Sequence, residues 1–168
     1  MFRGGEAALH EAGIDPAKAF IGSIAGTMGT TSVLAVGIGA ALLLFTRVIS
    51  WRLLLAQVIG LLLVAGLVDY LGAAPDTPAM PAWWHLLLGG FAFGAVFLAC
   101  DPGASCCTNP GRWAQGLLAG ALVVLIRAGS SSHPDAVIQA VLLASILAPL
   151  IDYAVVTLNI RRRARRHV

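Results

Sequence analysis

One acidic side chain lies inside a long apolar stretch near the end of this sequence, where a charge needs a physical reason. Asp152 follows Pro149 by three residues. Proline lacks a backbone N–H, so it leaves a carbonyl oxygen of the preceding helical turn without its usual donor. A carboxylate and free carbonyl oxygens at the same level of a membrane-spanning helix would suit a hard cation such as sodium, or a proton. The alternative is that Asp152 is a structural partner for Arg112 or another basic group.

A second acid, Asp101, ends an earlier apolar stretch and precedes Pro102. If the apolar stretches span a membrane, Asp101 and Asp152 lie toward the same side of it. Thr108 and Asn109 follow in the same connection. Asp101 is therefore a second candidate for chemistry on this side. Ordinary capping of the loop by Asp101 is the alternative.

A glycine- and hydroxyl-rich segment, Gly22–Ser32, is the third candidate. Glycines allow close backbone approach, and hydroxyls and free amides at the start of a helix can hold a phosphate or another anion. The pattern is too loose to be a motif from first principles. The sequence contains no Walker or dinucleotide fingerprint and no credible catalytic triad, so it predicts no catalytic residue. The spacing of Cys100, Cys106 and Cys107 does not match a zinc or iron–sulfur site and predicts small packing residues.

Five long apolar stretches must position these side chains. Of the 168 residues, 58% are hydrophobic and 11% are charged, and the mean hydropathy of +0.86 lies outside the range of soluble domains. Each stretch approaches the roughly 20 residues that a membrane-spanning helix needs. We predict an all-α integral membrane bundle of about five transmembrane helices, at residues 24–46, 51–72, 83–101, 112–128 and 135–158. The first is the least regular, because only Val33 to Phe45 is cleanly apolar.

The arginines predict the orientation of the bundle. Arg47, Arg52, Arg112 and the five arginines of the basic segment 159–168 fall on one side, and positive charge is retained in the cytoplasm. The C-terminus is therefore predicted to be cytoplasmic, and the polar segment 1–20 extracytoplasmic. The net charge of +3 arises largely from the tail, for which anionic lipid or partner subunits are favoured over nucleic acid.

Glycine pairs predict close helix packing. They occur as Gly90-x-x-x-Gly94 and Gly116-x-x-x-Gly120 in the third and fourth stretches. Such pairs let backbones approach in lipid, and we expect them to pack without taking part in chemistry.

The beginning of the chain is unusual, because residues 1–20 are polar and lack the apolar core of a signal peptide. Either the chain is the C-terminal part of a larger membrane protein, or another device inserts it. The first interpretation is the simpler one.

The sequence also resembles a known family, and the likeness extends over nearly the whole chain. It resembles the C-terminal half of NqrB, a membrane subunit of the sodium-translocating NADH:quinone oxidoreductase, in the family that includes RnfD of the Rnf complexes. The matching segments are Gly4–Leu9, Ala19–Gly22 with Gly26, Gly29 and Ser32, Thr46–Arg47, Ser50–Arg52, Met80–Pro81, Trp84–Leu86, Leu88–Gly94, Asp101–Pro102, Thr108–Asn109, Val124–Arg127, Ala148–Tyr153 and Asn159–Arg162. The Thr-Asn loop and the Asn-Ile-Arg-Arg tail favour the sodium pump over Rnf.

The resemblance implies a non-autonomous redox subunit of a multi-subunit complex in the bacterial inner membrane. The complex would transfer electrons from NADH to ubiquinone and export sodium. The family subunit carries a covalent FMN on a threonine of a Ser-Gly-Ala-Thr motif and contributes to riboflavin and quinone sites. By this resemblance, the flavin environment consists of Gly26, Thr27, Gly29, Thr30, Thr31 and Ser32, and the acids Asp101 and Asp152 match family positions linked to sodium passage.

The sequence departs from the family at two places. The Ser-Gly-Ala-Thr motif belongs just upstream of Gly4–Leu9, and this sequence does not contain it. The family typically has an acid where this chain has Thr30, so any part that this acid plays in tuning the flavin or the ion path is missing here. A non-redox membrane scaffold, a small transporter of the same fold, and RnfD of an Rnf-type electron transport complex therefore remain as alternatives.

Overall fold

The computed structural model describes residues 32–71, 86, 90–129 and 136–164, and these residues are almost entirely helical. The principal helices are α3 (Val33–Phe45), α4 (Trp51–Leu71), α7 (Asn109–Gly129) and α8 (Ala136–Ala164). Between α4 and α7 lie the short α6 (Phe91–Phe93) and the π-helix η1 (Gly94–Leu98). The predicted all-α class is confirmed for the described part of the chain. The number of membrane spans and the cytoplasmic C-terminus remain predictions.

Two of the described helices are long and apolar enough to cross a bilayer, judged by length and composition. They are Trp51–Tyr70 in α4 and Ala136–Arg163 in α8. Helix α3 is apolar but only 13 residues long, and its start at Val33 agrees with the short apolar core seen in the sequence. Helix α8 continues into the segment expected to be a basic tail.

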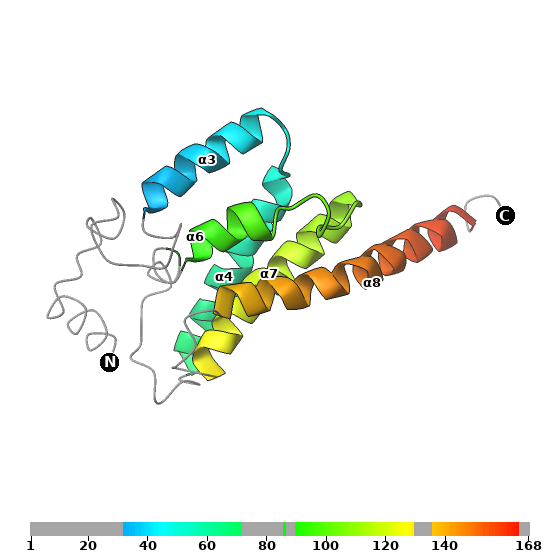
Figure 1. Ribbon diagram of the computed structural model, residues 1–168. Coiled ribbons are helices and arrows are strands. Elements are labelled where there is room, and N and C mark those ends of the chain that lie inside the picture. The colour runs from blue at the N-terminus through cyan, green and yellow to red at the C-terminus, as the bar shows by residue number, and fades with distance from the viewer. Residues whose placement is uncertain (1–31, 72–85, 87–89, 130–135, 165–168) are drawn as a thin grey trace, which may run out of the picture.

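The centre of the fold is the pairing of α4 with α7, against which α8 packs by its N-terminal half (Figure 1). A Cβ atom on Gly116 would lie 2.7 Å from the carbonyl oxygen of Leu53 in α4. One on Gly120 would lie 2.7 Å from the amide nitrogen of Leu61 and closer still to the carbonyl of Gln57. The two helices therefore touch backbone to backbone, which confirms the packing role predicted for this glycine pair.

The other glycine pair serves two different purposes. Gly90 has a φ of 67°, in the left-handed region that glycine adopts without penalty, and it begins α6. Gly94 faces the side chain of Val137 in α8, and a Cβ there would collide with it. The N–H of Ala99 donates to the carbonyl of Gly94 at 2.9 Å, the spacing of a π-helix. The expected regular span 83–101 therefore contains a widened turn where it meets α8.

Two apolar clusters hold these elements together. The larger joins α4, α6, η1, α7 and α8 around Leu61, Phe91 and Val123, and the smaller joins α3 to α4 and η1 around Val36, Leu53 and Val96. The C-terminal half of α8 extends beyond the other helices (Figure 1) and exposes apolar side chains along its length. Bulky apolar groups in that position suit lipid or another protein segment.

Candidate functional site

Asp152 lies against the loop that connects η1 to α7. Its carboxylate accepts a hydrogen bond from the backbone N–H of Cys107 at 2.7 Å and another from the N–H of Thr108 at 3.2 Å. The hydroxyl of Thr108 donates a third, short hydrogen bond to the same carboxylate. A carboxylate has about four lone-pair positions, and three donors from one loop use most of them. Asp152 therefore anchors this loop to α8.

The start of α7 is shaped to bring the loop this close. A Cβ atom on Gly111 would lie 2.5 Å from a carboxylate oxygen of Asp152 and 3.1 Å from the Cβ of Cys106. Only glycine leaves that space. The N–H of Gly111 also donates to the hydroxyl oxygen of Thr108 at 3.2 Å, so Thr108 caps α7 while it bonds Asp152.

Cys106, the residue before Cys107 in this loop, joins the loop to both α7 and α8. Its backbone N–H donates to the side-chain oxygen of Gln115 at 2.7 Å, and its thiol donates to the carbonyl of Ala148 at 3.3 Å. The amide of Gln115 donates in turn to the carbonyl of Ala104 at 3.1 Å. Burial, and next the charge of Asp152, raise the pKa of the Cys106 thiol to about 11, so the thiol stays protonated at neutral pH. The prediction of a small packing residue holds for the side chain, and Cys106 additionally donates two hydrogen bonds.

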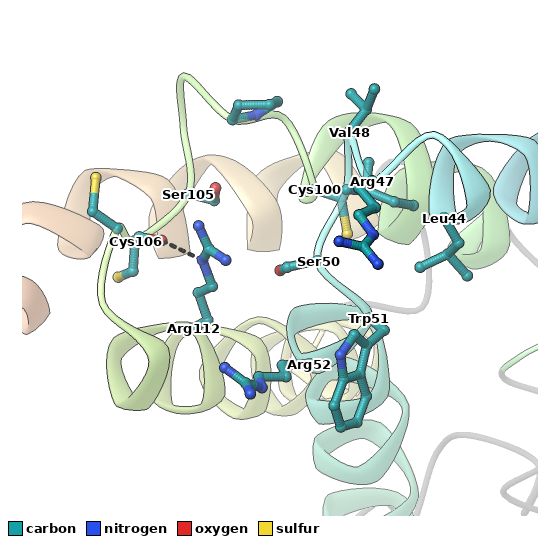
Figure 2. Close-up of a pocket in the computed structure, with 13 residues that line it drawn as sticks. Leu44, Arg47, Val48, Ser50, Trp51, Arg52, Cys100, Ser105, Cys106 and Arg112 are labelled. Carbon is teal, nitrogen blue, oxygen red and sulfur yellow. Dashed lines mark hydrogen bonds between the residues drawn. The ribbon is translucent and has the colours of Figure 1, made fainter.

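Arg112 contributes to the loop from the first turn of α7. Its Nε donates to the carbonyl of Cys106 at 2.9 Å (Figure 2). The hydrogen bonds of Asp152 come from Cys107 and Thr108, so the partner expected from the sequence, Arg112, is bound to the same loop rather than directly to the acid. Arg112 interacts with the carboxylate of Asp152 only electrostatically, without an ion pair between them.

Asp101 occupies the other end of the loop and is exposed. Its carboxylate accepts from the N–H of Gly103 at 3.1 Å, and its carbonyl accepts from the N–H of Ala104 at 3.1 Å. This is the geometry of loop capping, one of the two alternatives for this residue. Asp101 and Asp152 are therefore joined through one loop, and each carboxylate bonds different backbone amides.

The predicted flavin environment lies largely outside the described residues. Gly26, Thr27, Gly29, Thr30 and Thr31 belong to that part of the chain. Ser32 is described and is the N-cap of α3, where its hydroxyl accepts from the N–H of Ala35 at 3.3 Å. The flavin contacts of this segment therefore stay a prediction.

A pocket of about 530 Å³ opens beside the loop, between it and the turn that joins α3 to α4. Arg47, Arg52 and Arg112 all line it, and Trp51 stands at its edge (Figure 2). The sequence presented these arginines only as markers of membrane orientation. Their spacing along the chain, at the ends of three apolar stretches, was the available signal that they could converge.

Comparison with known proteins gives consistent matches. The model of the NQR2, RnfD, RnfE family matches residues 5–161. A protein of Azotobacter vinelandii, named as the B-subunit of Na(+)-translocating NADH-quinone reductase, is 42% identical over 166 residues, which cover 98% of this chain and 41% of the relative. Proteins of the same name are 40% identical in Stutzerimonas stutzeri (99% of this chain, 42% of the relative) and 43% identical in Klebsiella pneumoniae (97% and 40%). The chain thus spans about two-fifths of the length of these curated relatives.

The family match covers the anchoring loop, its partner Asp152 and the arginine pocket together, so these features lie within the homologous region. The chain belongs to the NQR2, RnfD, RnfE family.

Proposed function

We propose that this chain acts as the NqrB membrane subunit, or as a part of it, in a sodium-translocating NADH:quinone reductase. The observation that carries the proposal is the 42% identity to a protein named as that subunit over 98% of the chain. In this role the chain assembles with the other subunits in the bacterial inner membrane. There it takes part in flavin-mediated electron transfer to ubiquinone coupled to sodium export, and it has no activity alone.

The flavin chemistry belongs to the cofactor, and the protein part holds and tunes it. We propose Gly26–Ser32 as the flavin environment, on the basis of the resemblance and of Ser32 at the N-terminus of α3. FMN, where it is present, accepts and passes on electrons. Its covalent attachment is expected on the Ser-Gly-Ala-Thr segment that this sequence does not contain.

We propose that Asp101 and Asp152 contribute to the ion path through the loop that they share. Sodium prefers several oxygen ligands, and the carboxylate of Asp152 is occupied by three loop donors. A cation that took more than the one remaining lone-pair position of Asp152 would have to displace donors from Cys107 or Thr108. In this proposal, ion binding and release of the loop are coupled.

The test is to recover the tagged chain from its native membranes and ask what accompanies it. Co-purification of the other reductase subunits, with sodium-stimulated NADH:quinone reduction, supports the proposal. A chain recovered alone, or with components of an Rnf-type complex, contradicts it. Those results would support the scaffold or transporter in the first case and the Rnf alternative in the second.

Within an active complex, Asp152→Asn should lower the sodium stimulation of quinone reduction more than Asp101→Asn does. Each variant removes one carboxylate charge, Asp152 from α8 and Asp101 from the loop that Asp152 binds, so their difference reports the position of the acid. Equal sodium dependence in both variants and the wild type, with normal assembly, would remove both residues from the ion path.

A further inference from the structure

We infer that the pocket formed by Arg47, Arg52 and Arg112 binds the phosphate of an anionic phospholipid headgroup. This site is independent of the proposed redox function. Thirteen residues line the pocket, and three of them are arginines while none is acidic. A volume of about 530 Å³ is that of a small-molecule site. In Figure 2 the guanidinium groups of Arg47 and Arg112 lie on either side of Ser50, with Arg52 below.

No ion pair neutralises the charge of this pocket among the described residues, and only Arg112 has a carboxylate, that of Asp152, near enough for a longer-range attraction. Arg52 lies over the ring of Trp51, with its guanidinium carbon 5.5 Å from the ring centroid. Arg112 uses its Nε on the carbonyl of Cys106, which is a neutral partner. No carboxylate of the described residues is within ion-pair distance of Arg47, Arg52 or Arg112. Three cations collected around one cavity repel each other unless an anion joins them.

Two helix N-termini add to the positive potential. Arg52 is the second residue of α4 and Arg112 the fourth of α7, and both helices have 21 residues with no acid in the first turn. The N-terminus of a helix carries a partial positive charge, so a basic side chain there is unfavourable by itself. A bound anion would reverse the sign of this interaction, because it would meet both helix ends and the guanidinium groups.

The backbone conformation of Arg47 also supports a binding site here. The N–H of Arg47 donates to the carbonyl of Leu44 at 3.1 Å, and that of Val48 to Leu43 at 3.1 Å. These two bonds close α3 in a Schellman motif, in which the residue at the position of Arg47 is usually glycine. Arg47 has a φ of 57°, a conformation that side-chain-bearing residues rarely adopt. A strained residue with a functional side chain is typical of a binding site.

The surroundings favour a lipid over a free phosphate. Phe45, Val48 and Trp51 are 91%, 52% and 54% exposed, and they lie next to the arginines in the sequence. Exposed apolar groups beside a basic pocket suit a ligand that has both a phosphate and an acyl chain. Basic pockets between helices on the cytoplasmic side of a membrane are known to hold anionic headgroups. By the charge rule, this pocket lies on the side predicted to be cytoplasmic.

The experiment uses native mass spectrometry of the full chain in a neutral detergent. Phosphatidylglycerol and phosphatidylcholine with identical acyl chains are added in turn, and the bound fraction is measured. The pocket variant is Arg47→Gly with Arg52→Gln, in which glycine suits the positive φ. The matched control is Arg161→Gln with Arg162→Gln, which removes two exposed charges from the end of α8.

We expect the wild type and the control to retain phosphatidylglycerol in preference to phosphatidylcholine. The pocket variant should bind phosphatidylglycerol roughly 10- to 30-fold more weakly, since each cation near a headgroup contributes about a factor of five. Circular dichroism checks that both variants are folded. Arg52→Gln alone, which leaves the α3 turn untouched, should give a smaller loss in the same direction.

Three results would overturn the inference. The first is equal retention of the two lipids by the wild type, and the second is an equal loss of phosphatidylglycerol in the control, which would assign the lipid to the tail. The third comes from inorganic phosphate. If phosphate alone stabilised the wild type against heat as much as phosphatidylglycerol did, and the pocket variant removed that effect, the pocket would be a site for a soluble phosphate compound.

Discussion

Replacing Asp152 by asparagine should release the loop between η1 and α7. The carboxylate accepts hydrogen bonds from two backbone N–H groups and from the hydroxyl of Thr108. Asparagine has nearly the same shape but only one acceptor oxygen, and its NH₂ group would face a backbone donor. At least one loop N–H loses its partner, and the remaining hydrogen bonds become neutral.

The magnitude follows from the strengths of these bonds. A hydrogen bond to a charged group contributes about 1.5–3 kcal/mol and a neutral one about 0.5–1.5 kcal/mol. Asp152 is only half-buried and Cys107 is exposed, so water compensates for part of the loss. We therefore expect the closed loop to be destabilised by about 2 kcal/mol, which corresponds to a roughly 30-fold larger open population.

Cys106 offers a direct assay of loop opening. Its side chain is 1% exposed, and its thiol is hydrogen-bonded to the carbonyl of Ala148. A maleimide can react with it only after the loop moves. In a background of Cys100→Ala and Cys107→Ser, Cys106 is the single reporter, and Cys107→Ser keeps the backbone N–H that bonds Asp152. The labelling rate in Asp152→Asn should rise about 30-fold, in proportion to the open population.

Asp101→Asn is the matched control, because it makes the same chemical change at the other carboxylate that binds this loop. Asp101 is exposed, and among the described residues its carboxylate accepts one hydrogen bond, from the N–H of Gly103. Its substitution should raise the labelling rate by less than about threefold, as expected for a surface position. If the two variants labelled at the same rate, or if Asp152→Asn labelled like the parent, Asp152 would not be the anchor of the loop.

Three further predictions concern packing, backbone conformation and pH. Gly120→Ala should destabilise the chain by about 1–3 kcal/mol or more in detergent unfolding, because its Cβ would meet the backbone of α4; Gly66→Ala, which has open space, should be neutral or slightly stabilising. Arg47→Gly should raise stability by about 1 kcal/mol by relieving a positive φ, as measured by the same unfolding, and an unchanged midpoint would contradict strain at this residue. The pKa of Cys106 is raised from 9.0 to about 11, so the closed loop should be fully stable below pH 9 and weaken as the pH rises toward 11, because the released thiol ionises first. Thermal unfolding across that pH range should show this loss in the wild type, and Cys106→Ala should remove it.

Much of the fold could be predicted because long apolar helices leave a strong record in the sequence. The apolar stretches predicted α4 and α8, and the clean apolar core of Val33–Phe45 matches the bounds of α3. The glycine pair in α7 predicted the backbone contact with α4, since a small residue every fourth position has few other uses in lipid. Helical periodicity is local, and local signals survive in a single sequence.

The π-helix could not be predicted, because its cause is tertiary. Nothing in the sequence Gly94–Leu98 requires an extra residue in the turn. The widened turn occurs where Gly94 meets Val137, a residue more than forty positions later. Contacts between distant helices decide such details, and a single sequence does not reveal which helices meet.

The candidate site was also only partly predictable, because some of its contacts are local and others join distant segments. The sequence indicates that Asp152 needs a partner, and it is compatible with either an ion or a structural role. The structure assigns it three donors from the loop, two of which are backbone N–H groups. Backbone donors carry no residue signature, so a search for a charged partner leads to Arg112 and misses Cys107 and Thr108. Gly111 was the available clue, since a glycine at the start of a helix often marks a close approach.

The arginine pocket shows how one feature can satisfy two demands. Arg47, Arg52 and Arg112 each lie at the end of an apolar stretch, where positive charge fixes the orientation of the chain. Any basic residue near the end of the stretch would fix the orientation, and glycine could then occupy the positive-φ position after α3. The structure instead has an arginine at a positive φ and two more in the first turns of helices, where a basic side chain opposes the positive end of the helix. Orientation alone does not require three guanidinium groups around one cavity, whereas a shared phosphate ligand would be bound by all three.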